Sequence, residues 1–173
     1  MDALTTLLDR LARISGAAAA ASLAAIGVVI AAQIAARLFG QQIPAADDFA
    51  AWAMAASAFL ALPYALRHGD HIRVTLLVHL LPDSWQRPLE ILATAIGGAL
   101  ACWAAWYAVG FVFDSWSYDE VAQGMLRVPL WIPQLSMAIG MALFALMMVE
   151  RLLRVVLGLA LAEHAGGDAA RTE

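Results

Sequence analysis

The sequence is poor in charge, has a single cysteine and contains no lysine. Of its 173 residues, 14% are charged and 63% are hydrophobic, whereas roughly 25% of the residues of a soluble domain are charged. The lone thiol, Cys102, excludes a disulfide framework and a thiolate metal site. The ten basic residues are all arginines and form no basic stripe, which argues against nucleic-acid binding. This composition indicates a membrane protein.

Four long stretches contain no acidic residue, no basic residue and no histidine. They are residues 14–36, 49–66, 91–113 and 128–149, and each is close to the roughly 20 residues that a helix needs to cross a bilayer. We therefore predict an all-α membrane protein in which residues 1–173 form one transmembrane domain of four helices. The first stretch exceeds the apolar region of a signal peptide, about 7–15 residues, so we expect it to be retained.

The arginines predict the orientation of the chain. Eight of the ten precede span one, lie between spans two and three, or follow span four, while only Arg37 and Arg127 lie in the other two connections. Cytoplasmic segments carry the excess of arginine and lysine in membrane proteins. We therefore expect both termini and the central connection in the cytoplasm, with a flexible cytoplasmic tail at residues 160–173.

Two segments beside the spans each leave two interpretations open. Leucines at positions 4, 7, 8 and 11 have helical spacing, which is typical either of an amphipathic helix on the membrane surface or of an extension of span one. Residues 72–82 are apolar but too short to cross the membrane. They form a helical segment that either lies flat at the interface or extends helix two obliquely.

Several single residues have predicted structural roles. Asp47 or Asp48 is expected to cap the second helix. Gly97, one of four small residues at every fourth position, allows another helix to approach closely. Trp103 lies near the middle of span three and is expected to face another helix, because its indole N–H needs a partner. Pro133 lies in the first turn of the fourth helix or kinks it.

The sequence shows no set of residues suited to independent transport or catalysis. Uncharged spans are poorly suited to a pump or channel. Haem would need histidine inside a span, but His68, His71 and His79 lie between spans two and three and His164 is in the tail. Zinc normally has three or four protein ligands, and no nucleophile–base arrangement is recognisable. We expect neither an enzyme nor a bound metal or cofactor.

The segment after span two is the most specific part of the chain. Arg67-x-Gly69-x-His71-Ile72, followed by Leu-Leu-Pro at 80–82, resembles the small, DctQ-like membrane subunit of tripartite ATP-independent periplasmic (TRAP) transporters. The resemblance covers nearly the whole chain and includes two further features, the acidic pair that opens span two and the Val-Pro-Leu-Trp-Ile-Pro entry to span four at 128–133.

The resemblance implies a three-part transporter in the inner membrane of a bacterium. A periplasmic solute-binding protein captures an organic acid, such as a C4-dicarboxylate or a sugar acid, and a large permease subunit translocates it with sodium coupling. The small subunit is then a scaffold that packs against the large one, with no substrate site of its own. Membrane lipid is the other expected partner. The alternatives are the small subunit of a tripartite tricarboxylate-type carrier and a four-helix redox or enzyme subunit.

Roles for the motif follow from the same resemblance. Gly69 lets the chain turn after span two. Arg67 reaches lipid phosphate or pairs with a carboxylate, either Asp70 or one on a partner. His71 donates a hydrogen bond either to backbone or to the large subunit, and Ile72 belongs to the same motif at the partner interface. The alternative is that Arg67 and His71 simply finish the end of the helix. Asp47 and Asp48 face the periplasm, where the solute-binding protein docks; simple helix capping is the alternative for this pair.

Overall fold

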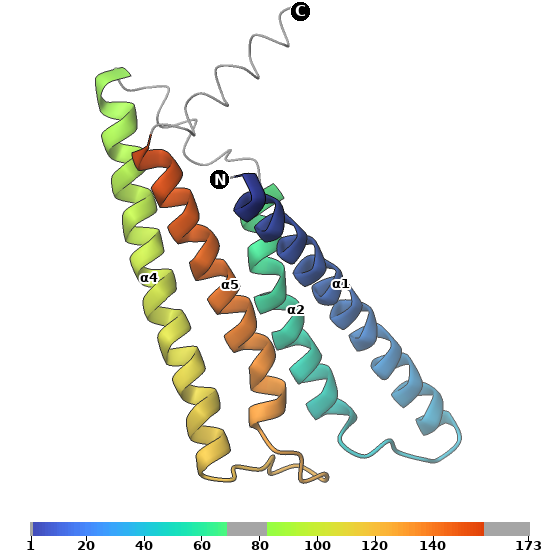
Figure 1. Ribbon diagram of the computed structural model, residues 1–173. Coiled ribbons are helices and arrows are strands. Elements are labelled where there is room, and N and C mark those ends of the chain that lie inside the picture. Colours follow the sequence, from blue (N-terminus) through green and yellow to red (C-terminus); the bar gives the residue numbers. More distant parts are fainter. Residues whose placement is uncertain (1, 69–82, 158–173) are drawn as a thin grey trace, which may run out of the picture.

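A computed structural model describes residues 2–68 and 83–157, with side chains described from 4 to 68 and from 87 to 157. Four helices make up most of this part of the chain: α1 (Asp2–Leu38), α2 (Ala46–His68), α4 (Asp83–Ser117) and α5 (Trp131–Val156) (Figure 1). All four are long and apolar enough to cross a membrane. The predicted all-α class and the four helices are confirmed. Residues 72–82 and 160–173, with their predicted interfacial segment and tail, lie outside the described residues.

The helices pack in the order α1, α2, α5, α4, as an open row (Figure 1). α2 contacts both α1 and α5, and α4 contacts α5, so that α1 and α4 form the two edges. The connections at residues 39–45 and 118–130 lie together at one end, called here the loop end. α1 begins, and α2 and α5 finish, at the opposite end, called here the Arg67 end.

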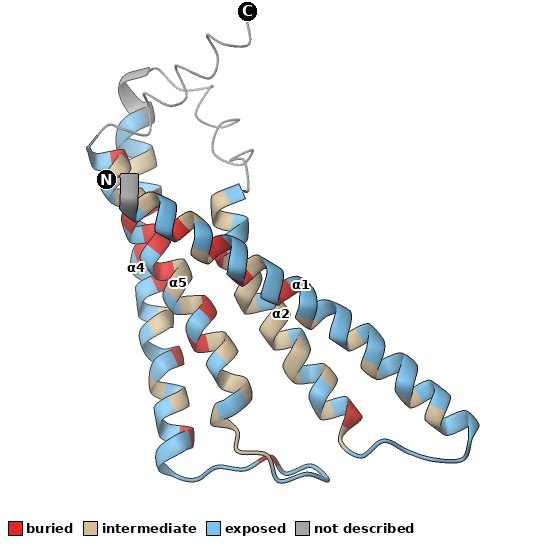
Figure 2. Ribbon diagram, turned by 45° about the vertical axis from the view of Figure 1, so that its right-hand side comes forward, coloured by how far each residue is buried: buried red, intermediate tan, exposed pale blue. Residues whose placement is uncertain are grey.

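An open row leaves most apolar side chains uncovered. Most buried residues lie on the faces between neighbouring helices, and the outward faces are largely exposed (Figure 2). The exposed side chains include Leu23 and Val28 on α1 and Ile96 and Trp103 on α4. Such surfaces are stable in hydrocarbon, where apolar groups need no cover from water. The exposure pattern therefore agrees with membrane insertion.

The N-terminal leucines belong to one continuous helix with span one. α1 has 37 residues, a length of roughly 55 Å, against about 30 Å for the hydrocarbon core. Its extra turns are packed within the protein, since Leu8 and Ala12 are buried against Met147 of α5. The interpretation as a separate helix on the membrane surface is therefore wrong, and the interpretation as an extension of span one is confirmed.

α2 meets its two neighbours around a proline. Pro63 lies inside the helix, and because it lacks an N–H it leaves the carbonyl of Phe59 without its helical partner. The Ser15 hydroxyl of α1 donates a hydrogen bond to the carbonyl oxygen of Leu60, at 2.6 Å. From the other side, the backbone of Gly140 in α5 lies so close to the Phe59 carbonyl that a Cβ there would collide with it. Backbone contact therefore joins α1, α2 and α5.

α4 meets α5 through small side chains. A Cβ at Gly97 would lie 2.9 Å from the terminal methyl of Met148, and Ala101 is buried in a cluster with Ala145 and Met148. Glycine at position 97 therefore leaves room for the end of the methionine side chain. Of the four-residue stripe, only Ala93 is exposed, at the end nearest the start of α4.

The first residues of α2 contradict the prediction that Asp47 or Asp48 caps this helix. α2 begins at Ala46, preceded by Ala45 with a positive φ of 56°, so that Asp47 and Asp48 lie inside the first turn. Neither occupies the N-cap position, and the predicted capping role is wrong. Negative charge in the first turn still favours the helix dipole. Pro133 is the third residue of α5, which confirms its place in the first turn.

The connection between α4 and α5 is folded onto the end of α4. Ser115 donates a hydrogen bond from its hydroxyl to a carboxylate oxygen of Glu120, at 2.7 Å, and Leu130 donates its N–H to the Glu120 carbonyl, at 2.9 Å. The carboxylate of Asp48 lies directly against Gly124, where a Cβ would collide with it. The connection therefore also contacts the start of α2.

Candidate functional site

Four charged residues from three helices meet at the Arg67 end and are called here the Arg67 cluster: Asp9, Arg67, Glu150 and Arg154. Arg67, in the last turn of α2, lies between two carboxylates. Its Nε is 3.4 Å from Oδ1 of Asp9 on α1, and its Nη2 is 3.3 Å from Oε2 of Glu150 on α5. The second carboxylate oxygen of Glu150 accepts a hydrogen bond from Nε of Arg154, four residues further along α5.

The cluster is charge-balanced and lies mostly out of contact with solvent. Two arginines face two carboxylates, and the side chains of Arg67 and Glu150 are 17% and 10% exposed. The Nε and Nη2 atoms of Arg67 are buried and make no hydrogen bond within the described part of the chain, so charge attraction alone joins them to the carboxylates. Removing one member would leave a poorly solvated charge without compensation.

An apolar layer lies beside the cluster. Leu8 and Ala12 of α1 and Met147 of α5 are buried together, and Leu11 and Leu66 pack against them. Because Leu8 precedes Asp9, Leu66 precedes Arg67, and Met147 lies three residues before Glu150, the same three helix turns supply both layers. The apolar contacts hold the helices at a distance from which the charged groups can reach one another.

α4 is joined to α5 at the same end by two arginines. Nη2 of Arg87 donates a hydrogen bond to the carbonyl oxygen of Val156, at 3.0 Å. That carbonyl is one of the last of α5, which have no partner within the helix. Arg151 lies 4.0 Å from Glu90, and each side chain is about a quarter exposed. Polar contacts therefore connect all four helices at the Arg67 end.

The structure places the sequence-predicted residues in different regions. Arg67 belongs to the cluster, and within the described residues its carboxylate partners are Asp9 and Glu150. Gly69, His71 and Ile72 lie outside the described residues, as does Asp70.

Trp103 is 63% exposed and contacts Tyr107 of its own helix, with ring centroids 4.9 Å apart and ring planes tilted by 59°. It therefore does not face another helix of the described chain. Asp47 is exposed at the loop end, where the neighbouring Asp48 lies against Gly124.

Sequence reasoning missed three members of the cluster. Asp9 and Glu150 are 58 and 83 residues from Arg67 in the sequence, and no local pattern connects them. One local signal was available. Glu150 and Arg154 have the i, i+4 spacing of a helical ion pair, and Glu150 directly follows the uncharged stretch 128–149. An acidic residue at the end of a span, next to arginines, is the kind of position that points to a buried pair.

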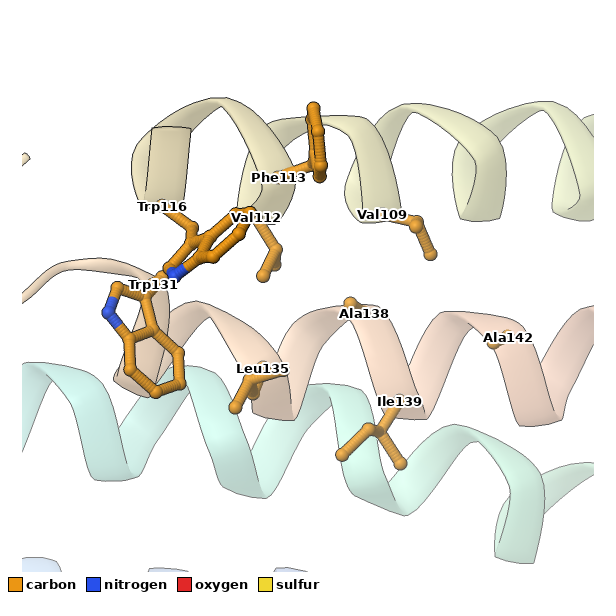
Figure 3. A pocket seen from close by; sticks show the side chains of 9 residues that line it. All are labelled: Val109, Val112, Phe113, Trp116, Trp131, Leu135, Ala138, Ile139 and Ala142. Atoms are coloured by element: carbon orange, nitrogen blue, oxygen red, sulfur yellow. The ribbon is translucent and has the colours of Figure 1, made fainter. Parts of the chain in front are cut away.

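An apolar pocket of about 490 Å³ lies between α4 and α5 near the loop end (Figure 3). Trp116 of α4 and Trp131 of α5 lie side by side at one end of the pocket, and aliphatic side chains and one phenylalanine line the remainder. Its lining consists of Val109, Val112, Phe113, Trp116, Trp131, Leu135, Ala138, Ile139 and Ala142. A pocket of this composition suits hydrocarbon, because its lining offers only the two indole N–H groups for hydrogen bonding.

The described residues contain no group of three or more His, Cys, Asp or Glu side chains placed to hold a metal ion. His68 stacks on Tyr64, with ring centroids 4.0 Å apart.

In chemical terms, the Arg67 cluster neutralises charge at the helix ends and fixes three helices relative to one another.

Comparison with known proteins assigns the chain to a family. No curated protein sequence matches it. The family model described as "Tripartite ATP-independent periplasmic transporters, DctQ component" matches residues 25–158, more than three quarters of the chain. The match includes α2, α4 and α5 and three members of the Arg67 cluster; Asp9 lies before it. The chain belongs to the DctQ family, the small membrane subunit of tripartite ATP-independent periplasmic transporters.

Proposed function

We propose that this subunit is a scaffold that packs against the large permease subunit of its transporter. In this proposal the complex takes up an organic acid, such as a C4-dicarboxylate or a sugar acid, by sodium-coupled transport that depends on a periplasmic solute-binding protein. The small subunit contributes no substrate-binding residue. It enlarges the stationary part of the complex, while the solute crosses the membrane in the large subunit.

The observation that carries this proposal is the open row of helices. A transporter working alone would need a polar path within its spans. Here the charged groups lie near the helix ends, and the outward faces between them are apolar and exposed. Such faces can be covered by another membrane protein, and the contacts at the Arg67 end hold the row together while they are covered.

The orientation belongs to the same proposal. Arg67, Arg87, Arg151 and Arg154 all gather at the Arg67 end, and positive residues are enriched on the cytoplasmic side of membrane proteins. We place that end and both termini in the cytoplasm of a bacterium, and the loop end in the periplasm. Asp47, exposed at the loop end, would then be available to the solute-binding protein.

The motif that begins at Arg67 has a physical role in this proposal. Because Arg67 is held by carboxylates of α1 and α5, the chain leaves α2 from a fixed position. Gly69, His71 and Ile72 follow directly, and we propose that this segment meets the large subunit. The rival tricarboxylate-type carrier and the redox subunit are disfavoured by the family match.

Co-purification from native membranes through a C-terminal tag tests the scaffold function. We expect a large multi-span permease to be recovered in stable association. Proteoliposomes holding both subunits should take up solute only when the solute-binding protein and a sodium gradient are supplied. The matched control omits the small subunit and should lose uptake. Recovery of the chain alone, or together with redox subunits, would contradict the proposal.

A further inference from the structure

The two edges of the helix row differ in chemistry. On α1 the large exposed side chains along the middle of the helix are aliphatic, for example Leu23 and Val28. On α4 the middle of the helix exposes Trp103, Trp106 and Tyr107, which are 63%, 79% and 61% exposed. Aliphatic side chains are fully compatible with lipid tails. Indole and phenol rings carry a polar group that favours a hydrogen-bond partner.

Trp103 lies at a depth where lipid supplies no such partner. It is one residue from the centre of the uncharged stretch 91–113, whereas tryptophan is enriched at the two interfaces of a membrane. Within the described part of the chain its only recorded interaction is the ring contact with Tyr107. Hydrocarbon has no acceptor for the indole N–H, and leaving a polar group unsatisfied there is costly.

The direction of Trp103 excludes cover by the rest of the described chain. Residues of α4 that face α5 include Thr94, Ala101 and Ala108, which are buried. At 100° per residue, Trp103 is rotated by about 200° from Ala101 and points away from α5. α4 is also the edge of the row. Trp103 and Tyr107, whose rings are in contact and tilted by 59° to each other, therefore form an aromatic surface that faces outward at mid-membrane depth.

We propose that the outer edge of α4, centred on Trp103, is the surface on which the large membrane subunit packs. The partner presents a transmembrane helix whose small residues accept the indole ring and whose hydroxyl or backbone carbonyl accepts its N–H. The aliphatic edge formed by α1 faces lipid. This inference rests on the proposed scaffold function and adds the side of the small subunit on which the complex forms.

Site-specific photo-crosslinking in the intact complex tests the inference. p-Benzoylphenylalanine replaces Trp103 in one variant and Leu23 in the matched control, because both residues are 63% exposed and both lie near the middle of a span. We expect an adduct with the large subunit from position 103 and not from position 23. Three results would overturn the inference: an adduct with the large subunit from position 23, a crosslink from position 103 to a second copy of this chain, or no protein adduct from position 103.

Substitutions measure the hydrogen bond and the ring separately. Trp103→Phe removes the N–H and should weaken association with the large subunit about threefold, the typical effect of a hydrogen bond between membrane helices. Trp103→Ala also removes the ring and should weaken it tenfold or more, as for an interfacial tryptophan anchor. Leu23→Ala should leave it unchanged. Equal affinity of Trp103→Ala and the wild type would refute the inference, while the proposed function fails only if the wild type itself does not bind the large subunit.

Discussion

Replacing Glu150 by glutamine should destabilise the subunit more than any other single neutralisation at the Arg67 end. Glutamine keeps the size of the side chain and removes its charge. Among the described residues, Glu150 is the carboxylate that contacts both arginines of the Arg67 cluster, at 3.3 Å from Arg67 and hydrogen-bonded to Arg154. Once it is neutral, the half-exposed Asp9 is the remaining carboxylate that the described residues place against Arg67.

The magnitude follows from distance and exposure. At 3.3 Å and an effective dielectric constant of 20, one ion pair has a Coulomb energy of about 5 kcal/mol. Losing a partner costs about 3–5 kcal/mol in a fully buried pair and at most about 1 kcal/mol on the surface. Glu150 is 10% exposed, but the arginines are 17% and 22% exposed and can turn toward water. We therefore expect Glu150→Gln to lower the free energy of unfolding by about 2–3 kcal/mol.

Equilibrium unfolding of the purified subunit in detergent, followed by tryptophan fluorescence, measures this change. The matched control is Glu90→Gln, at the same end but in a 4.0 Å pair whose side chains are each about a quarter exposed, and it should cost less than about 1 kcal/mol. A cycle of Glu150→Leu and Arg67→Met should show a coupling of at least about 1 kcal/mol. A loss for Glu150→Gln no larger than that for Glu90→Gln would refute the reasoning.

Three further predictions concern packing and orientation. Gly140→Ala should lower the free energy of unfolding by more than about 2 kcal/mol, because its Cβ would collide with the Phe59 carbonyl; Gly27→Ala, in open space, should be neutral or slightly stabilising. Ser15→Ala should cost about 1 kcal/mol through the lost bond to the Leu60 carbonyl, and a cost near zero by the same assay would contradict that contact. A C-terminal green fluorescent protein fusion should fluoresce in cells and a C-terminal alkaline phosphatase fusion should be inactive, whereas the opposite result would place the terminus in the periplasm.

The number of helices could be predicted from sequence because it depends on local composition alone. Four uncharged stretches gave four helices, but each helix extends beyond its stretch. α4 begins eight residues before its uncharged stretch and α5 continues seven residues after its own. The predicted spans contained no charged residue, but the helices continue through charged residues such as Glu90 and Arg151. A charged side chain is tolerated at the end of a span because it can pair with a charge on a neighbouring helix, as these two do.

The candidate site was less accessible to sequence reasoning for a physical reason. Arg67 could be singled out from the motif, yet its partners Asp9 and Glu150 lie on helices distant in the sequence. Backbone contacts such as that between Gly140 and Phe59 help to decide which helices become neighbours. A periodic pattern in the sequence does not reveal such contacts. Sequence reasoning about Arg67 considered only its local segment, and so it did not include the two carboxylates on α1 and α5.

The arrangement of joined helix ends and exposed helix faces suits the proposed scaffold role of so small a subunit. Its helices are joined near their ends, by ion pairs and a hydrogen bond at the Arg67 end and by the folded connection at the loop end. Between the ends, the helices touch through glycine and alanine, which keeps the row thin. A closed four-helix bundle would bury much of the apolar surface that this row exposes. The open row can therefore hold a partner along an edge without first separating its own helices.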